Sequence, residues 1–201
     1  SGELTAMGHG VEVLYGHEFG PSKEPLLREI AFFDTAADKS GPLKRAARDV
    51  RNAFSGKFTQ VAEAVPLSGA VIATAFKAQL PQCRRILNAP DVFRRANGAF
   101  ALGGGLTNVR LDRAPDLAHW TYPLPIRAGG CANLYTLHDL VPLRLPYTTL
   151  DRKKRYLALM RELARRADHL VTVSESSRRD IISLLGVSED RISNTYQSVA
   201  I

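Results

Sequence analysis

Side chains that can do chemistry stand at the ends of three predicted strands, 116–120, 131–137 and 169–173, of which 131–137 is an uninterrupted, mostly apolar run. They form three pairs: Trp120 and Tyr122, His138 and Asp139, and Ser174 and Glu175. An apolar run that stops abruptly at polar residues is typical of a strand in a sheet covered by helices on both faces. Because parallel strands of such a sheet end at one edge, we expect the three pairs to rim a single cleft.

Each pair has a chemical interpretation and a structural one. His138 can donate or accept a proton near neutral pH and can hold a sugar hydroxyl, but a histidine followed by aspartate in a loop is often a surface or packing pair. Trp120 and Tyr122 offer flat faces suited to a sugar ring or an apolar tail, and Trp120 equally fits a core position. Ser174 opens a predicted helix whose dipole favours an anion, and it is also an ordinary N-cap.

Several common catalytic patterns are missing from the sequence. The other histidines share no metal-ligand spacing, so the sequence predicts no metal site. Ser174 does not lie in a GxSxG motif, which argues against a serine hydrolase. The run Gly103–Gly105 lacks the spacing of a GxGxxG dinucleotide motif and is expected to be a flexible turn.

The elements that position these residues alternate between strands and helices. Further strands are expected at 11–15 and 191–196, and helices at 42–54, from about 90, at 150–167 and at 174–186. The stretch 68–76 fits a buried strand or a helix segment equally well. Strands separated by helices indicate an α/β protein with a Rossmann-like, doubly wound and mostly parallel sheet.

The predicted helix at 150–167 has an apolar face and a strongly basic face. The apolar face is expected to pack on the sheet through Leu150, Leu157, Met160, Ala164 and Ala167. The basic face should then point outward and begins with Arg152, Lys153, Lys154 and Arg155. Such a face can attach to an anionic membrane, although charged helix faces are more often simply solvated.

Composition sets broad limits on the class of protein. The chain has 201 residues, of which 45% are hydrophobic, so one large domain with a full core is expected. A net charge of +7 permits acidic partners but chooses none, and the sequence gives no reason to predict nucleic-acid binding. The two cysteines, Cys83 and Cys131, lack CxxC spacing and fit a reduced, cytoplasmic protein. No run approaches the roughly 18 apolar residues of a membrane span, and no signal segment opens the chain.

Two long motifs carry a resemblance to a known family. The motif YTLHDLVPLRLP is followed by a basic helix and then by RADHLVTVSESSRRDIISLLGVSEDRI. This order resembles the amino-terminal domain of retaining glycosyltransferases of family 4, which have the GT-B fold. The resemblance is strong over 116–196, and LTAMGHGVEVLY is similar to the end of that family's first helix and its second strand. In the family this domain mainly holds the acceptor, and a second Rossmann-like domain holds the nucleotide-sugar.

The resemblance implies roles for individual residues. His138 matches the family histidine that lies beside the donor sugar and contributes to catalysis. Asp139 matches its usual polar follower, and Ser174 and Glu175 match the serine and glutamate of the TVSE stretch at the cleft edge, with Glu175 structural. The co-substrate would be a nucleotide-sugar and the acceptor a glycan or a lipid-linked molecule. No metal or other cofactor is implied.

The departures from the family pattern concern the ends of the chain. The family's first strand with its glycine-rich loop and the carboxyl-terminal donor-binding domain are not found in residues 1–201. We therefore expect one acceptor-side domain that is inactive alone, cut from a parent retaining hexosyltransferase of polysaccharide or glycolipid biosynthesis. The parent would be cytoplasmic or peripheral at the inner membrane face. An unpaired strand edge would favour self-association. The alternative is a non-catalytic, truncated binding or interaction module.

Overall fold

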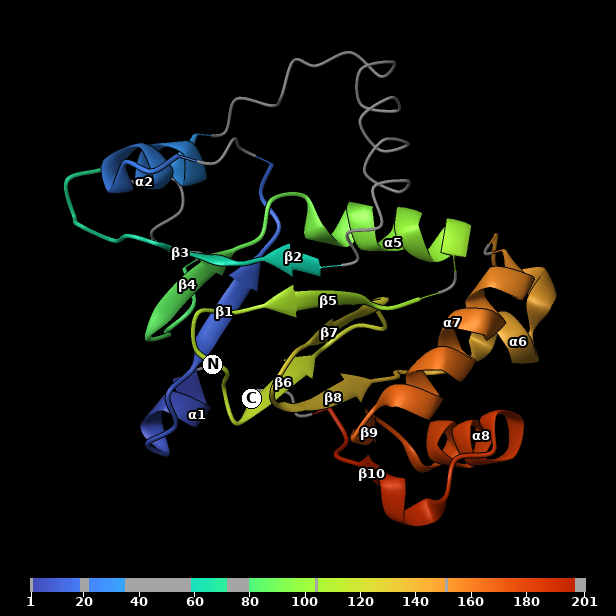
Figure 1. Ribbon diagram of the computed structural model, residues 1–201. Coiled ribbons are helices and arrows are strands. Elements are labelled where there is room, and N and C mark those ends of the chain that lie inside the picture. Colours follow the sequence, from blue (N-terminus) through green and yellow to red (C-terminus); the bar gives the residue numbers. More distant parts are fainter. Residues whose placement is uncertain are drawn as a thin grey trace. The chain divides into compact units, whose positions relative to one another are not determined.

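The fold is mixed α/β and is organised as two compact units (Figure 1). The computed structural model describes residues 2–18, 22–34, 59–71, 80–103, 105–150 and 152–197. Unit 1 contains residues 1–95 and 109–112, and unit 2 contains residues 96–108 and 113–201. Along the chain, helix α5 (Val92–Gly103) and strand β5 (Thr107–Arg110) each begin in one unit and end in the other.

Unit 1 is built on a short mixed sheet with the order β1-β4-β3. Its elements are α1 (Gly2–Ala6), β1 (Glu12–Tyr15), α2 (Pro25–Phe33), β2 (Thr59–Val61), β3 (Glu63–Val65) and β4 (Arg85–Asn88). Strand β1 pairs in parallel with β4, and β3 pairs antiparallel with β4. Phe32 of α2 packs with Val65 and Ile86 to form the buried core of this unit.

Unit 2 contains the predicted cleft residues. Its further elements are β6 (Leu117–Trp120), β7 (Ile126–Ala128), β8 (Ala132–Thr136), α6 (Val141–Arg144), the 3-10 helix η1 (Pro146–Thr148), α7 (Lys153–Arg166), β9 (His169–Thr172), α8 (Glu175–Leu185), the 3-10 helix η2 (Glu189–Arg191) and β10 (Ile192–Asn194). The strands β10-β9-β8-β6 form a four-stranded sheet in which every neighbouring pair is parallel. The predicted Rossmann-like, mostly parallel architecture is confirmed.

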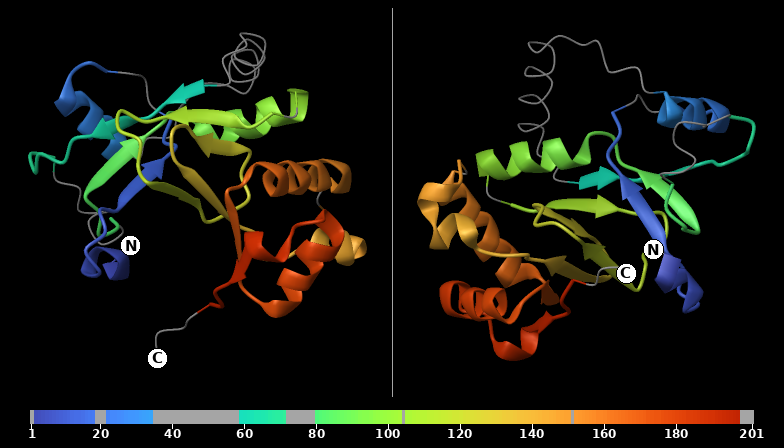
Figure 2. Two further views of the ribbon diagram at one scale, coloured as in Figure 1. Left: turned by 60° about the horizontal axis from the view of Figure 1, so that its bottom comes forward. Right: turned by 180° about the vertical axis from the view of Figure 1, so that it is seen from behind.

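The order of strands in unit 2 fixes where its helices lie. The strands β8, β9 and β10 follow each other both in the chain and across the sheet. Because parallel crossovers are right-handed, the two intervening helices must cover the same face. Figures 1 and 2 show α7 and α8 side by side on that face. Fully buried side chains of α7, β9 and α8, including Met160, Leu170 and Ile181, lie in this layer.

Most elements of unit 2 lie where the sequence predicts them, but the start of α7 does not. The helix begins at Lys153 rather than at 150, and Leu150 is fully exposed instead of packed on the sheet. The reason is the preceding 3-10 turn, after which Thr149 is extended, so Leu150 stands ahead of the helix. The buried face of α7 consists of Met160, Leu163 and Ala164.

Other predictions made from the sequence fall partly or wholly outside the described residues. The predicted helix at 42–54 lies outside them, as does most of the stretch 68–76. Residues 68–71 are neither helix nor strand. The strand at 11–15 and the helix starting near residue 90 are confirmed by β1 and α5. Within the described ranges no helix combines the length and the apolar character that a membrane span needs.

Edge strands and thiols complete the description of the two units. In the described residues, the outermost strands are β1 and β3 in the sheet of unit 1 and β6 and β10 in the four-stranded sheet of unit 2, and association through such an edge stays a prediction. Each unit carries one half-buried cysteine thiol, Cys83 in unit 1 and Cys131 in unit 2, and neither forms a disulfide. Burial is the main cause that raises the pKa of both thiols.

Candidate functional site

A pocket of about 610 Å³ opens in unit 2 where β6 and β8 end and α7 begins. The residues that give it chemical character are Asn97, Tyr122, His138, Asp139, Arg152 and Arg155. Three of them, Tyr122, His138 and Asp139, were predicted from the sequence to meet at one strand edge, and the structure brings them together.

A hydrogen bond fixes the tautomer of the neutral His138 ring in the pocket. Its Nε2 lies 3.0 Å from the backbone oxygen of Thr121. A carbonyl oxygen only accepts, so Nε2 of His138 must carry a proton, and in the neutral ring Nδ1 is left as an acceptor. The backbone before the histidine is also fixed, because Thr172 Oγ1 donates to the Leu137 oxygen at 2.7 Å. The ring can therefore accept a proton or a hydrogen bond from a bound hydroxyl.

The aspartate next to this histidine has a local structural function. Its Oδ1 accepts a 2.9 Å hydrogen bond from the backbone N–H of Val141, at the start of α6. The hydroxyl of Tyr156 donates to the backbone oxygen of Asp139 at 3.1 Å and ties α7 to this loop. Asp139 is exposed on the pocket, and its carboxylate has oxygen lone pairs beyond the one that Val141 uses.

The two aromatic residues after β6 divide between the pocket and the interior. Tyr122 is 63% exposed and lines the pocket. Trp120 is buried, and its ring stacks on Tyr135 with 6.4 Å between ring centroids. Its indole N–H donates to Asn133 Oδ1 at 3.0 Å. Trp120 is therefore a core residue and does not line the pocket, whereas Tyr122 offers an accessible aromatic face.

Sequence reasoning missed the residue that organises the interior next to the pocket. The Asn133 side chain is 1% exposed, and its oxygen accepts from Trp120 and from the Ala128 N–H. Its amide nitrogen donates to the backbone oxygens of Ala128 and Cys131, each at 2.9 Å. Nothing in the sequence distinguishes this asparagine, because its partners come from two strands and a loop.

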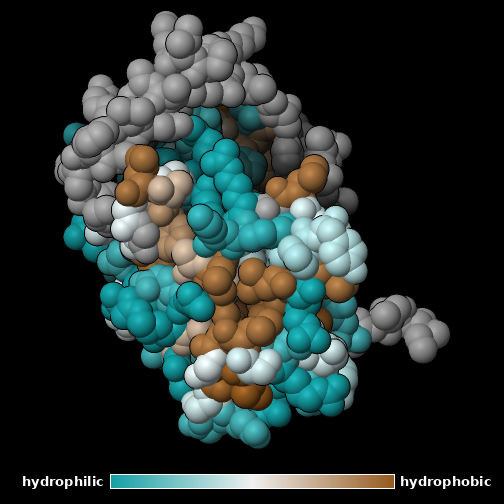
Figure 3. Space-filling view, turned by 90° about the vertical axis from the view of Figure 1, so that its right-hand side faces the viewer, coloured by the Kyte–Doolittle hydropathy of each residue, from teal (hydrophilic) through white to brown (hydrophobic). Residues whose placement is uncertain are grey.

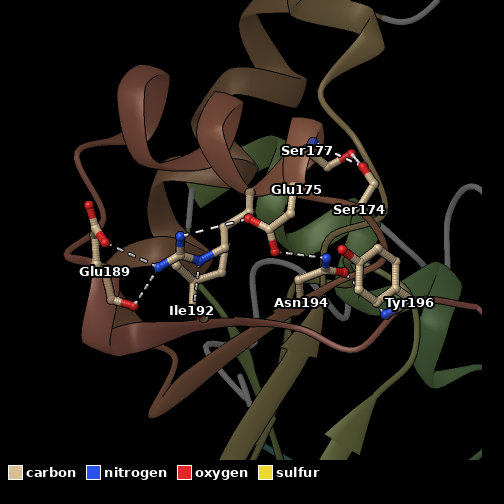
Figure 4. A network of polar contacts seen from close by, with 8 residues as sticks. Ser174, Glu175, Ser177, Glu189, Ile192, Asn194 and Tyr196 are labelled. Atoms are coloured by element: carbon tan, nitrogen blue, oxygen red, sulfur yellow. Dashed lines mark hydrogen bonds and ion pairs between the residues drawn. The ribbon is translucent and has the colours of Figure 1, made fainter.

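Ser174 and Glu175 do not line the pocket but belong to a polar network at the start of α8 (Figure 4). Ser174 is the N-cap of α8, and its Oγ accepts from the Ser177 N–H at 3.0 Å. Glu175 accepts from the Asn194 side chain at 2.9 Å and lies 3.9 Å from Arg178. Ser174 therefore caps α8 from within, and Glu175 links α8 to β10. A direct contact of either side chain with substrate stays a prediction.

The four basic residues expected to form an outward surface differ in their surroundings. Arg152 and Lys154 are exposed, whereas Lys153 and Arg155 are half-buried. Lys153 donates to the Thr149 backbone oxygen at 2.7 Å, and Arg155 donates to the Asn97 backbone oxygen at 2.6 Å. Arg152 and Arg155 line the pocket.

A periodic signal in the sequence identifies this pocket wall in retrospect. The residues of α7 and its N-cap that line the pocket are Arg152, Arg155, Tyr156, Leu159 and Met160. Their spacing is that of one helix face. The basic residues were expected to face outward because the apolar stripe that begins at Leu150 was expected to pack on the sheet. Asn97 carried no such signal, because it lies 58 residues before its partner Arg155.

Comparison with known proteins places the chain in a family. Residues 70–197 match the model of Glycosyltransferase Family 4, which covers well over half of the chain and includes the whole pocket. The chain therefore belongs to glycosyltransferase family 4. No curated protein and no solved structure matches it. In the described residues no group of three or more His, Cys, Asp and Glu side chains is arranged to hold a metal ion.

Proposed function

We propose that this chain is the acceptor-binding part of a retaining hexosyltransferase, which moves a sugar from a nucleotide-sugar to an acceptor hydroxyl. The observation that carries the proposal is the pocket at the ends of β6 and β8, which holds His138, Asp139 and Tyr122 within the region of the family match. The nucleotide-sugar is a co-substrate, and its binding is assigned to a second, donor-side domain. The acceptor would be a glycan or a lipid-linked molecule.

His138 has the geometry that the proposed role requires. Its Nε2–H is engaged by the Thr121 oxygen, which leaves Nδ1 of the neutral ring as acceptor for a substrate hydroxyl. Tyr122 adds an exposed aromatic face of the kind on which sugar rings stack. His138 is the proposed catalytic residue, and Asp139 and Tyr122 are proposed to bind substrate. Ser174 and Glu175 are proposed to support the cleft edge.

The 201-residue chain alone is expected to transfer no sugar. Catalysis across a two-domain cleft needs groups of both walls in place, and the proximity and orientation of bound reactants contribute up to about 7–11 kcal/mol to the barrier. The purified chain is incubated with UDP- and GDP-sugars and a panel of glycan and lipid acceptors. The same assay on the chain extended in its reading frame by a donor-binding domain is the positive control.

Sugar transfer by the 201-residue chain, if it is abolished by His138→Ala, would contradict the proposal that a second, donor-binding domain is needed. Tight binding of a macromolecular partner together with inactivity of the extended polypeptide would instead favour the second candidate, a non-catalytic binding or interaction module. The Ser174–Glu175 network favours neither candidate, because it uses its polar groups within the fold.

A peripheral contact with an anionic membrane, on the cytoplasmic side, is also proposed. Figure 3 faces the side of the molecule that carries α6, α7 and α8, where hydrophobic residues gather among hydrophilic ones. Just before α7, Tyr147 is 83% exposed and Leu150 is fully exposed, and the exposed Lys154 follows on the helix. Apolar and basic side chains together suit an anionic lipid surface.

Replacing the exposed Lys154 by glutamine is expected to weaken binding to anionic vesicles about fivefold, at about 1 kcal/mol for one charge near the surface. Co-sedimentation with vesicles of phosphatidylglycerol and phosphatidylcholine measures the effect, and pure phosphatidylcholine vesicles are the control. Equal sedimentation with both kinds of vesicle would contradict an electrostatic contact.

A further inference from the structure

The first turn of α7 has the wrong charge for a helix of its kind. Its N-cap is Arg152, whose side chain makes no capping hydrogen bond, and its first turn contains no acidic residue. Lys153, Lys154 and Arg155 follow directly. The amino end of a helix carries a partial positive charge, so each of these cations is repelled by the helix dipole. Exceptions to the preference for acidic residues in the first helical turn are expected at functional sites, and here a bound anion would supply the compensating negative charge.

Two of these cations are placed to meet such a ligand in the pocket. The guanidinium of Arg155 is half-buried and oriented by Asn97, whose backbone oxygen accepts from Nη2 at 2.6 Å. That contact uses one of three guanidinium nitrogens, so donors remain for a ligand. Arg152 is exposed at the pocket, and the described part of the structure gives its side chain no hydrogen bond or ion pair.

The other wall of the pocket has a different character. His138 leaves Nδ1 as an acceptor for a hydroxyl, and Tyr122 offers an aromatic face. Asp139 is the carboxylate of the pocket, and one of its oxygens is already engaged by the Val141 N–H. The pocket of about 610 Å³ is therefore lined both by two arginines and by an imidazole nitrogen that can accept from a hydroxyl.

We propose that this pocket selects an acceptor that carries a phosphate group, with Arg152 and Arg155 binding the phosphate and His138 facing the reacting hydroxyl. This inference rests on the proposed function, because it names the class of acceptor for the same site. Two guanidinium groups match the charge of a phosphate dianion, and their planar forks match its oxygens. A neutral sugar would leave the two arginines with the single carboxylate of Asp139 as counter-charge in the pocket.

The binding experiment uses the 201-residue chain and three soluble probes: inorganic phosphate, glucose 6-phosphate and glucose. Binding is followed by NMR titration or calorimetry, so it needs no transferase activity. We expect glucose 6-phosphate to bind at least tenfold more tightly than glucose, and inorganic phosphate to compete with it. Equal binding of the two sugars, or no binding of either, would overturn the proposal.

The variants are chosen so that folding does not decide the result. Arg152→Gln removes an exposed side chain and is expected to weaken glucose 6-phosphate binding about tenfold without changing the melting temperature. Arg155→Lys keeps the charge but loses the fork, and should weaken binding as well. Arg161→Gln is the matched control, because Arg161 is an exposed arginine of the same helix that does not line the pocket. An equal loss in Arg161→Gln, or no loss in Arg152→Gln, would overturn the proposal.

The phosphate can belong to a soluble sugar phosphate or to a lipid headgroup, and a vesicle arm separates the two sources. If glucose 6-phosphate displaces the chain from vesicles of phosphatidic acid, a phosphomonoester lipid, in the wild type but not in Arg152→Gln, the pocket binds the headgroup. If the vesicles do not compete with glucose 6-phosphate, the source is soluble, and both results support a phosphate site.

Phosphate binding without transfer by the extended polypeptide would refute the proposed function alone. Transfer to neutral acceptors that is unaffected by Arg152→Gln would refute this inference alone.

Discussion

Asn133→Ala is expected to lower the free energy of unfolding of unit 2 by about 3–4 kcal/mol, a large fraction of the stability of an ordinary domain. The side chain is buried, and all four of its hydrogen-bonding positions are used, two by the oxygen and two by the amide nitrogen. Removing it takes this partner from the Trp120 indole N–H, the Ala128 N–H and two backbone oxygens, of which the Ala128 oxygen keeps its 3.9 Å contact with the Cys131 thiol. Each buried unpaired group costs about 1–3 kcal/mol, and water entering the small cavity recovers part of that sum.

Urea denaturation measures this effect with a built-in probe. Trp120 is the single tryptophan of the chain and stacks in the same buried cluster, so its emission reports unfolding of unit 2. Circular dichroism provides a second signal that the substitution does not touch directly. The control is Asn194→Ala, which removes a half-buried asparagine whose two side-chain hydrogen bonds, to Glu175 and from the Tyr196 N–H, are both exposed to water. This substitution should cost less than Asn133→Ala, because water can replace exposed partners. Similar losses in the two variants would show that the Asn133 network does not hold the unit together.

His138→Ala, in the polypeptide that includes a donor-binding domain, is expected to reduce kcat at least tenfold. The upper limit of the loss is the contribution of general acid–base catalysis, about 10²–10⁴-fold. The expectation follows from its place in the pocket and from the acceptor nitrogen that its bond to Thr121 leaves available. The melting temperature should change little, because the ring is only half-buried and its one hydrogen bond, to the Thr121 oxygen, is accessible to water. Loss of such a bond costs about 0.5–1.5 kcal/mol.

A second histidine of unit 2 provides the matched control. His169 is also half-buried and also makes one side-chain hydrogen bond, 2.9 Å to Ser193, but it does not line the pocket. His169→Ala should therefore leave kcat within about twofold of the wild type, since surface substitutions away from a site change little. A large stability loss in His138→Ala with normal activity of the folded fraction would make His138 a structural residue.

The architecture of unit 2 was predictable because its strands are continuous apolar runs bounded by polar residues. Strands β8 and β9 and helix α8 follow directly from the runs at 131–137 and 169–173 and from the N-cap Ser174. Such features are local, so a single sequence contains them. The predicted start of α7 was wrong because the extended Thr149 after the 3-10 turn has no local signature, and Leu150 fits the helical period by chance.

The candidate site was predictable only in part, because pockets depend on contacts between distant residues. Proximity of His138, Asp139 and Tyr122 follows from the rule for parallel strand ends, and the structure bears it out. The pairing of Arg155 with Asn97 joins residues 58 positions apart and has no local signature. The same holds for Asn133, whose importance lies in the backbone groups that surround it rather than in its own position.

The distribution of thiols has a consequence for how this protein unfolds. With Cys83 in one unit and Cys131 in the other, each unit contains one thiol whose reaction with an alkylating reagent reports on that unit. Burial raises the pKa of both thiols, so little reactive thiolate is present at neutral pH while either unit is closed. Opening of a unit exposes its half-buried thiol and removes the burial that raises its pKa, so alkylation of each sulfur accelerates when its own unit opens. Whether the two rates accelerate under the same conditions shows whether the units open together or one at a time.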